Sequence, residues 1–409
     1  ALDGVYLDDP AVASDAEALA RLGAAVVREG RHGLDVQADR FVGVVRLGPV
    51  QLRVRPKLPL PTLWSVVAYG LDLPLDLRRP PVDLAAEGDL PDLLVELLLR
   101  AAEGLARAGL HRAYVRREGW LSSPRGRLDP VALERAGPPT RAALPCGRFE
   151  FEADHLLNGV IAAGLTLATR LASTPALRSA AHREATAWRS VCTPVPLTAT
   201  NLDAADRQRG RLAVHYAPVH RLVRLLAAGA GLSDDMRAGE VRVPGQMWDM
   251  ASVFERFVAR FLAEHVEDCV VDVQPPFRDL YTVAPGAHGH RAPRPRPDIV
   301  LRRGATPIAV FDTKYLDAWT HGLSRTALYQ LSVYAIAWAP SDDVPIPAVV
   351  LYPSDVPRRD IAYSLHPAGG PPRPILLRAV DWADAASALR EHGRVAERIA
   401  MARRWAGLA

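Results

Sequence analysis

The stretch PDIVLRRGATPIAVFDTKY, residues 297–315, decides the fold of the C-terminal part of this chain. Asp298 opens an apolar run, Gly304 marks a turn, and the chain returns as a second apolar run, so the stretch predicts two paired strands. Side chains alternate between the two faces of a strand, so Asp312 and Lys314 should point the same way. Strand pairing can bring Asp298 alongside Asp312. We therefore expect two carboxylates and a lysine to converge at the end of a small sheet.

This combination of side chains has the chemistry that metal-dependent phosphodiester hydrolysis requires. Carboxylate oxygens bind Mg²⁺, a hard cation that prefers oxygen ligands. The cation polarises the phosphate and generates hydroxide, and a nearby ammonium stabilises the developing negative charge. The alternative for an isolated Asp-x-Lys pattern is a surface ion pair. The functional interpretation is favoured because the motif follows a second strand-borne aspartate and is set among apolar residues, Ile308, Val310 and Phe311.

Lysine usage also points to this motif. The chain has 50 basic residues, of which only Lys57 and Lys314 are lysines. Together with abundant Ala, Gly and Pro, this indicates drift in a GC-rich genome, in which arginine is the default cation. The guanidinium of arginine is bulkier and keeps its proton, so the two cations differ at a tight catalytic site. Chance retention of two lysines is the alternative, and the neighbours of Lys314 favour a function.

Two helical segments near the motif each offer a further candidate. The segment MWDMASVFERFVARFLAEHV has the periodicity of an amphipathic helix, with Glu255 expected in its first turn and off the apolar stripe. Glu255 is a candidate catalytic acid, but Ser252 and Glu255 also fit a capping box at the helix terminus. The segment LSRTALYQLSVYAIAWA predicts a helix on which Tyr329 and Gln330 could face the metal site. A buried helix glutamine more often only hydrogen-bonds within the core, so both assignments stay open.

The length and composition indicate a cytoplasmic α+β multidomain protein. With 409 residues, 49% hydrophobic and 23% charged, the chain can form two or three domains and is not a disordered polymer. No apolar run is long enough to span a bilayer, and the N-terminus lacks signal-peptide features. Three widely spaced cysteines fit a reducing compartment better than a zinc ribbon or a disulfide framework. The net charge of +4 is compatible with nucleic acid.

The pattern along the chain predicts three segments. Residues 1–95 read as a β-rich N-terminal domain, because apolar residues alternate from Val50 onward and Gly48-Pro49 separates two strands, as in a hairpin. Residues 96–240 form a mainly helical region in which helix formers dominate. Residues 241–409 form a mixed α/β domain that contains the Asp-x-Lys motif.

The central segment also contains a basic section, VRREGWLSSPRGRLDP, that reads as a loop. It places Trp120 among four arginines, a combination that can contact phosphates or a partner protein. A solvated surface loop is the alternative. The four arginines are Arg116, Arg117, Arg125 and Arg127.

The order of the short motifs resembles a known nuclease superfamily. The chain has no GxxxxGK[ST] motif, so it is not expected to bind a nucleotide alone. The succession P-D, D-x-K-Y and Y-Q-L-x-x-Y-A instead resembles the PD-(D/E)xK nucleases, and more specifically the McrC family of McrBC-type modification-dependent restriction systems. The resemblance covers most of the chain, because it includes MWDMASVFERFV, VGVVRLGPVQLRVRPKL, GRLD and CGRFEFEADHLLN as well as PDIVL, FDTKY and LYQLSVYA.

This resemblance implies roles for individual residues. Asp298, Asp312 and Glu255 would bind Mg²⁺, with Mn²⁺ as a substitute, in a C-terminal restriction-endonuclease-like domain. Lys314 would position the water or stabilise charge, and Gln330 would match the helix glutamine of the motif that follows.

The resemblance also implies partners. The chain would cleave double-stranded DNA as the endonuclease subunit of a GTP-dependent, methylcytosine-type restriction system that serves phage defence. A hexameric McrB-like AAA+ GTPase would be the partner, whose nucleotide hydrolysis the chain would stimulate. The N-terminal and mainly helical parts would dock on or into this ring, and the four arginines are candidates for that contact.

Two other functions stay open. The chain could be a stand-alone DNA repair nuclease of the same superfamily, which would cut without a partner or GTP. It could also be a non-catalytic activator of a ring NTPase with a decayed nuclease core. The intact set of Asp298, Asp312 and Lys314 argues against this second alternative.

Overall fold

The computed structural model describes most of the chain. The described residues are 2–21, 23, 25–38, 40–56, 58–73, 75–77, 90–136, 142–208, 210–230, 245–277, 280–281, 294–315, 322–341, 343–354, 356, 358–367 and 370–408. Lys57, singled out by its rarity, lies outside them. In this part of the chain, no helix is both long and apolar enough to cross a membrane.

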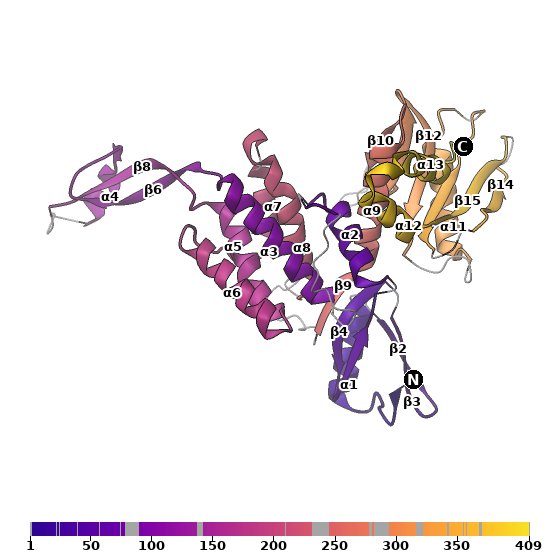
Figure 1. The fold of residues 1–409 in the computed structure, drawn as a ribbon, viewed down its shortest axis with the longest axis horizontal. Helices are drawn as coiled ribbons and strands as arrows, with labels where there is room; N and C mark the ends of the chain where they lie inside the picture. The colour runs from indigo at the N-terminus through magenta and orange to yellow at the C-terminus, as the bar shows by residue number, and fades with distance from the viewer. Residues whose placement is uncertain are drawn as a thin grey trace, which may run out of the picture. The chain divides into compact units, whose positions relative to one another are not determined.

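The chain folds into two compact units of mixed α/β structure (Figure 1). One unit combines Ala1–Leu90 with Arg242–Ala409, and the other is Pro91–Val241. The first and third of the segments expected from the sequence therefore share one unit, while the central segment forms its own.

The N-terminal part of the first unit contains two small antiparallel sheets. One has the strand order β1-β3-β2, with strands Leu2–Asp3, Gly33–Ala38 and Ala25–Gly30. The other has the order β5-β4-β9, with strands Val50–Val54, Phe41–Leu47 and Gly245–Asp249. The hairpin predicted around Gly48 is confirmed as the β4–β5 pair. Gly48 has φ +58°, and a Cβ atom there would collide with Val12 of α1 (Pro10–Arg21), so the turn requires glycine.

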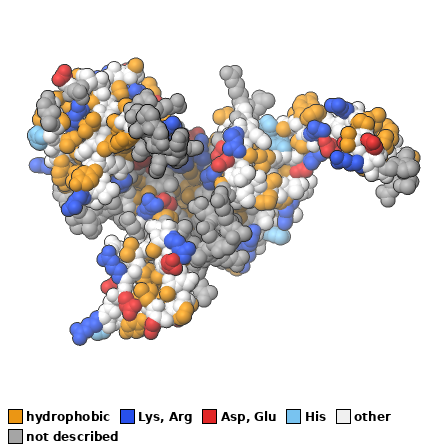
Figure 2. Space-filling model, turned by 180° about the vertical axis from the view of Figure 1, so that it is seen from behind, with side chains coloured by type: hydrophobic (Ala, Val, Ile, Leu, Met, Phe, Trp, Pro, Cys, Tyr) orange, Lys and Arg blue, Asp and Glu red, His pale blue; other side chains and the backbone are white. Residues whose placement is uncertain are grey.

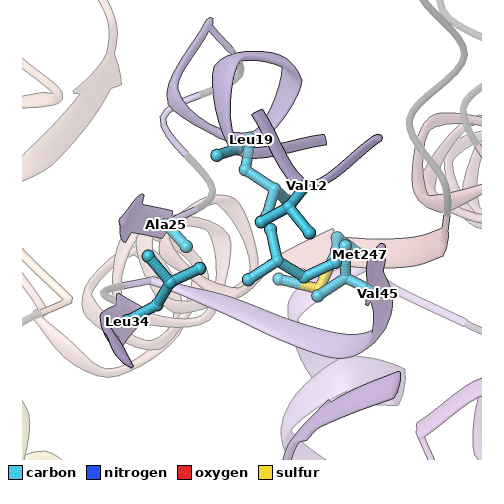
Figure 3. Close-up of a cluster of buried hydrophobic side chains, with 8 residues drawn as sticks. Val12, Leu19, Ala25, Leu34, Val45 and Met247 are labelled. Carbon is cyan, nitrogen blue, oxygen red and sulfur yellow. The ribbon is translucent and has the colours of Figure 1, made fainter. Parts of the chain in front are cut away.

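Strand β9 connects the two sequence segments of the first unit. It pairs antiparallel with β4, although about two hundred residues separate them in the sequence, and Met247 joins the apolar core of the N-terminal part (Figure 3). The strand leads directly into α9 (Met250–His265). Packing of the N-terminal sheets therefore fixes the start of the helix that carries Glu255. The buried residues of this core are Val12, Ala16, Leu19, Ala25, Leu34, Val45, Leu47 and Met247.

A six-stranded sheet forms the C-terminal part of the first unit. Its order is β10-β11-β12-β13-β15-β14, antiparallel from β10 to β12, parallel from β12 through β13 to β15, and antiparallel at β14. The two paired strands predicted within residues 297–315 are confirmed as β11 and β12. The strands are Val270–Val273, Ile299–Arg303, Thr306–Thr313, Ala348–Pro353, Arg373–Val380 and Ile361–Leu365, in sheet order.

Helices pack on this sheet and on one another. Helix α11 (Arg325–Ala337) buries Leu331 and Ala335 against apolar side chains of β13 and β15. Helix α2 (Leu60–Gly70) packs on α9, where a Cβ atom at Gly70 would lie 3.2 Å from the backbone nitrogen of Phe257. Helices α12 (Trp382–Arg390) and α13 (Val395–Ala406), joined by the 3₁₀ turn η2 (His392–Arg394), complete this layer through Trp382 against Phe254 and Trp405 against Phe261.

The second unit is a helical bundle from which a β-sheet arm projects (Figure 1). The bundle lies within the segment that was expected to be mainly helical. Its helices are α3 (Leu90–Ala108), α5 (Leu156–Leu171), α6 (Pro175–Arg189), α7 (Ala199–Gln208), the 3₁₀ helix η1 (Arg211–Tyr216) and α8 (Ala217–Gly229).

The section read as a basic loop is largely a strand, so that prediction was wrong. β6 (Ala113–Leu121) pairs over its whole length with β8 (Leu144–Glu152), and the short β7 (Arg127–Leu128) pairs with β8 on its other side. The helix α4 (Pro130–Ala136) follows β7. The sequence of β6 does not show the usual alternation of apolar and polar residues, because its exposed face carries both aromatic and charged side chains. Its partner strand, β8, also lies further along the chain. We call these four elements the arm.

Candidate functional site

The candidate site is built where β11 and β12 meet α9 and α11. Asp298 immediately precedes β11, and Asp312 is the penultimate residue of β12. The antiparallel register pairs Ile299 with Phe311, so continuing it by one residue places Asp298 opposite Asp312, as the sequence predicted. The strand residues next to this point are apolar and buried, and Asp312 itself is buried while Asp298 is partly exposed.

Asp312 and Lys314 lie on the same side, as expected from strand alternation. Lys314 Nζ is 2.9 Å from Asp312 Oδ2, and the aspartate side chain is only 4% exposed while that of the lysine is 33% exposed. Burial raises the pKa of Asp312, the nearby Lys314 ammonium opposes that rise, and the negative charge of Asp298 adds to it. Lys314 thus pairs with a buried carboxylate while its own side chain stays partly exposed to solvent.

Gln330 contacts the buried aspartate from α11. Its Nε2 donates to Asp312 Oδ1 at 3.3 Å and to the Tyr334 hydroxyl at 2.8 Å. That hydroxyl in turn donates to the backbone carbonyl of Arg296, two residues before Asp298. Gln330 therefore faces the site rather than serving only the helix core, whereas its neighbour Tyr329 is 66% exposed.

Glu255 projects from the second turn of α9, not from the first. The helix begins at Met250, and Asp249 is its N-cap, with its side chain accepting from the backbone N–H of Ala251. Ser252 is therefore inside the helix, and the capping-box interpretation of Ser252 and Glu255 is wrong. Asp249 is also the last residue of β9 and pairs with Phe41 of β4, so the helix begins directly after this strand.

Glu255 interacts electrostatically with Asp298 and Asp312, and we call these three side chains the acidic group. Burial is the main cause that raises the pKa of Glu255, and the charge of Asp298, followed by that of Asp312, adds to it. A hydrogen bond from Gln274 Nε2 to Glu255 Oε1, 2.7 Å long, opposes the rise. Three carboxylates from separate parts of the sequence thus act on one another, and a bound cation would relieve their repulsion.

Asp298 has a partner that the sequence did not suggest. Its Oδ2 accepts from the backbone N–H of Thr313 at 2.6 Å and from the Thr313 hydroxyl at 2.8 Å. Strand alternation turns Thr313 away from the side of Asp312 and Lys314, yet its hydroxyl reaches Asp298. These bonds hold one oxygen of Asp298.

The donors present suit a hard divalent cation held by few protein ligands. Asp312 Oδ2 is fully buried, and among the described residues no donor gives it a hydrogen bond of ordinary geometry, although the Lys314 ammonium lies beside it. No three His, Cys, Asp or Glu side chains in the described part are arranged around one metal position. Mg²⁺ is commonly bound through one or two carboxylates, with waters and phosphate oxygens completing its octahedron. Asp312 with Asp298 or Glu255 fits this mode.

The four candidate arginines lie on the arm and have different surroundings. Arg117 is bound internally: its Nε is 2.5 Å from Glu152 and its Nη2 is 2.8 Å from Asp154, which also accepts from the Thr193 backbone. It anchors the arm to the bundle, and the Thr193 and Arg117 bonds lower the pKa of Asp154. The remaining three, Arg116, Arg125 and Arg127, are exposed, and Arg116 pairs with Glu118 at 2.7 Å.

One face of the arm displays aromatic side chains that sequence reasoning did not recognise as a surface. Tyr114 is 73% exposed and lies opposite Phe151, with their ring centroids 5.1 Å apart. Phe149 is 69% exposed and lies opposite Arg116. Trp120 continues the row toward a groove of about 620 Å³ beside α4. Figure 2 shows apolar side chains along the arm among blue and red ones.

Two motifs of the arm have a structural explanation. Gly126 has φ +81°, and a Cβ atom there would collide with the carbonyl of Gly147, so the GRLD segment needs glycine to pack against β8. Asp129 of the same segment accepts from the backbone N–H of Ala132 in α4. In the segment that ends β8, Asn158 donates to the carbonyls of Ala153 and His111 and joins the arm to α5.

Gln274, Thr313 and Tyr334 complete the site but were not predicted. A signal for Tyr334 existed, because it lies four residues after Gln330 and therefore on the same helix face. Gln274 carries no such signal, since only strand pairing brings it to Asp298 and Glu255.

Asp298, Asp312 and Lys314 at the ends of β11 and β12, together with Glu255 of α9 and Gln330 of α11, form a site with the oxygen donors that hard cations prefer, at the edge of a mixed sheet. The sequence model of one family, described as McrBC 5-methylcytosine restriction system component, matches residues 36–353. The chain belongs to this family, which confirms the recognition made from its motifs.

Comparison with solved structures shows a related fold. A chain of the half-complex from the tetradecameric assembly of Thermococcus gammatolerans McrB AAA+ hexamers with bound McrC aligns with a TM-score of 0.52 at 20% identity, covering 95% of this chain and 86% of that chain. A chain of the Thermococcus gammatolerans McrBC complex aligns with a TM-score of 0.41 at 21% identity, covering 57% and 68%. No curated protein matches this chain.

The raised pKa of Glu255 leads to a pH-dependent prediction. A carboxyl whose pKa is higher in the folded than in the unfolded state stabilises the protein less as pH rises through that interval. In the presence of EDTA, the melting temperature of Glu255→Gln relative to that of the wild type should therefore rise as the pH is raised above about 4.5. Thermal unfolding measures this difference. Glu267→Gln, at an exposed turn, is the control, and a Glu255→Gln difference that does not change with pH would contradict the prediction.

Proposed function

We propose that this chain is the Mg²⁺-dependent endonuclease subunit of a modification-dependent restriction system, and that its six-stranded sheet is a PD-(D/E)xK nuclease domain. The observation that carries the proposal is the buried Asp312 carboxylate, held between Lys314 and Gln330 with two further carboxylates nearby. Family membership supports it, because the matched family is a component of the McrBC restriction system.

Asp312, with Asp298 or Glu255, would hold the cation. When bound, Mg²⁺ supplies charge that polarises the phosphate and lowers the pKa of a water molecule. Gln330 fixes one oxygen of Asp312, so the other, buried oxygen keeps its orientation. Thr313 fixes one oxygen of Asp298 in the same way.

Lys314 acts on the substrate side. Its ammonium touches Asp312 and is still partly exposed, so it can hold the attacking water or donate to a phosphate oxygen as negative charge develops. Water attacks phosphorus and loses a proton to solvent, the bond to the leaving oxygen breaks, and that oxygen takes up a proton from solvent. The apolar surroundings of β12 strengthen each of these electrostatic contacts by excluding water.

The partner is proposed to be an McrB-like AAA+ hexamer that hydrolyses GTP. The aligned chain belongs to an assembly of McrB AAA+ hexamers with bound McrC, which supports this partner. The arm is the surface that we assign to the contact, because it exposes Tyr114, Phe149 and Phe151 in one row with Arg116. Exposed aromatic and arginine side chains are typical of protein interfaces.

The first test is cleavage of double-stranded methylated DNA with the AAA+ partner, GTP and Mg²⁺. Asp312→Asn should lower the rate by at least about a thousandfold, and Lys314→Met by about a hundredfold or more, because charge stabilisation is lost. Asp268→Asn is a matched control, since Asp268 is exposed with φ +64°, a conformation that asparagine tolerates. Cleavage at the wild-type rate by both site variants would overturn the proposal.

The second test addresses the arm. Phe149→Ser should keep the fold, because the ring is 69% exposed, but should reduce stimulation of the partner's GTP hydrolysis roughly tenfold or more. The measurement is GTPase activity titrated with each variant. Tyr363→Ser, at an exposed position of β14, serves as the control and should stimulate normally. Undiminished stimulation by Phe149→Ser would exclude this face as the contact.

A further inference from the structure

Gln274 occupies a backbone conformation that glutamine rarely adopts. It follows β10 directly and has φ +49°, in the left-handed region that glycine and asparagine tolerate best. Its N–H donates to the carbonyl of Asp298 at 2.8 Å, and its carbonyl accepts from Arg296 Nε at 2.7 Å. Arg296 and Asp298 therefore bind both the carbonyl and the N–H of Gln274.

The conformation directs the Gln274 side chain to the acidic group. Its Nε2 donates to Glu255 Oε1 at 2.7 Å, and among the described residues this is the only hydrogen bond given to the Glu255 carboxylate. One residue therefore contacts Glu255 through its side chain and Asp298 through its backbone. No other described residue joins these two acids by hydrogen bonds.

We propose that Gln274 is a positioning residue for the cation site, which fixes the Glu255 carboxylate relative to Asp298. The inference rests on the proposed function, because it assumes that the acidic group holds a divalent cation. Residues that orient metal ligands strongly affect metal affinity without touching the metal.

An amide suits this task better than a cationic side chain. It fixes one carboxylate oxygen by donating a hydrogen bond, and it leaves the negative charge of Glu255 available to the cation. An arginine or lysine at this position would form an ion pair and compete with the cation for the same charge. The left-handed conformation persists although it is unfavourable for glutamine, as expected where the surroundings require a defined side-chain direction.

The test measures Mn²⁺ and Mg²⁺ binding to the purified full chain by calorimetry. Gln274→Met keeps the side-chain length but cannot donate, and Gln274→Asn keeps the amide but does not reach Glu255. Both should bind the cation about tenfold or more weakly. Gln37→Met is the matched control, because Gln37 is exposed in β3 of the N-terminal sheets.

Gln274→Asn separates positioning from a merely structural role. Asparagine adopts positive φ more readily than glutamine, so this variant should melt at the same or a higher temperature while its cation affinity falls. In partner-dependent cleavage, the Mg²⁺ concentration for half-maximal rate should rise about tenfold, with most of the maximal rate recovered at saturating Mg²⁺. A structural role would instead predict unchanged affinity for Gln274→Asn.

The outcomes distinguish this inference from the proposed function. If Asp312→Asn loses the cation while both Gln274 variants bind it as tightly as the wild type, the role assigned to Gln274 is wrong. If the wild type binds no cation, or Asp312→Asn binds it normally, the cation site itself is wrong and the inference fails with it. Weaker binding by both Gln274 variants and normal binding by Gln37→Met supports the inference.

Discussion

The site depends on the burial of one charged group, the Asp312 carboxylate, near the end of an inner strand of an apolar sheet. Transfer of a carboxylate away from water is unfavourable unless it is paired or hydrogen-bonded. Lys314 and Gln330 compensate this only in part, since the pKa of Asp312 stays above its usual value. A buried acid whose charge disfavours folding is typical of a functional site. A bound cation would supply the missing compensation.

Distant parts of the chain supply the groups around this carboxylate. β12 carries Asp312, α11 carries Gln330, and α9 carries Glu255, whose helix starts where β9 leaves the N-terminal sheet. The N-terminal part therefore helps to position an acid of the site, although it contributes none of the groups that we assign to catalysis. The arm belongs to the other unit, so the proposed partner contact and the proposed chemistry are carried by separately folded parts.

Local sequence patterns predicted the hairpin of β11 and β12, the shared face of Asp312 and Lys314, and the helix that carries Gln330. These features follow from alternation and periodicity within about twenty residues. The pattern could not predict that Gln274 lies in the site, because its backbone pairs with Asp298, which lies more than twenty residues further along the chain. It also could not predict the N-cap of α9, because this helix begins where β9 ends its pairing with β4. The arm was missed because β6 and β8 recognise each other across a non-local connection and expose aromatic residues that usually signal a buried face.

Anomalous X-ray diffraction from crystals of the full chain soaked in Mn²⁺ tests the central claim most directly. The account predicts a manganese peak at coordination distance from Asp312 and from at least one of Asp298 and Glu255, and no such peak in crystals of Asp312→Asn. Manganese bound only elsewhere, with these carboxylates retaining solely their contacts to Lys314, Thr313 and Gln274, would contradict it.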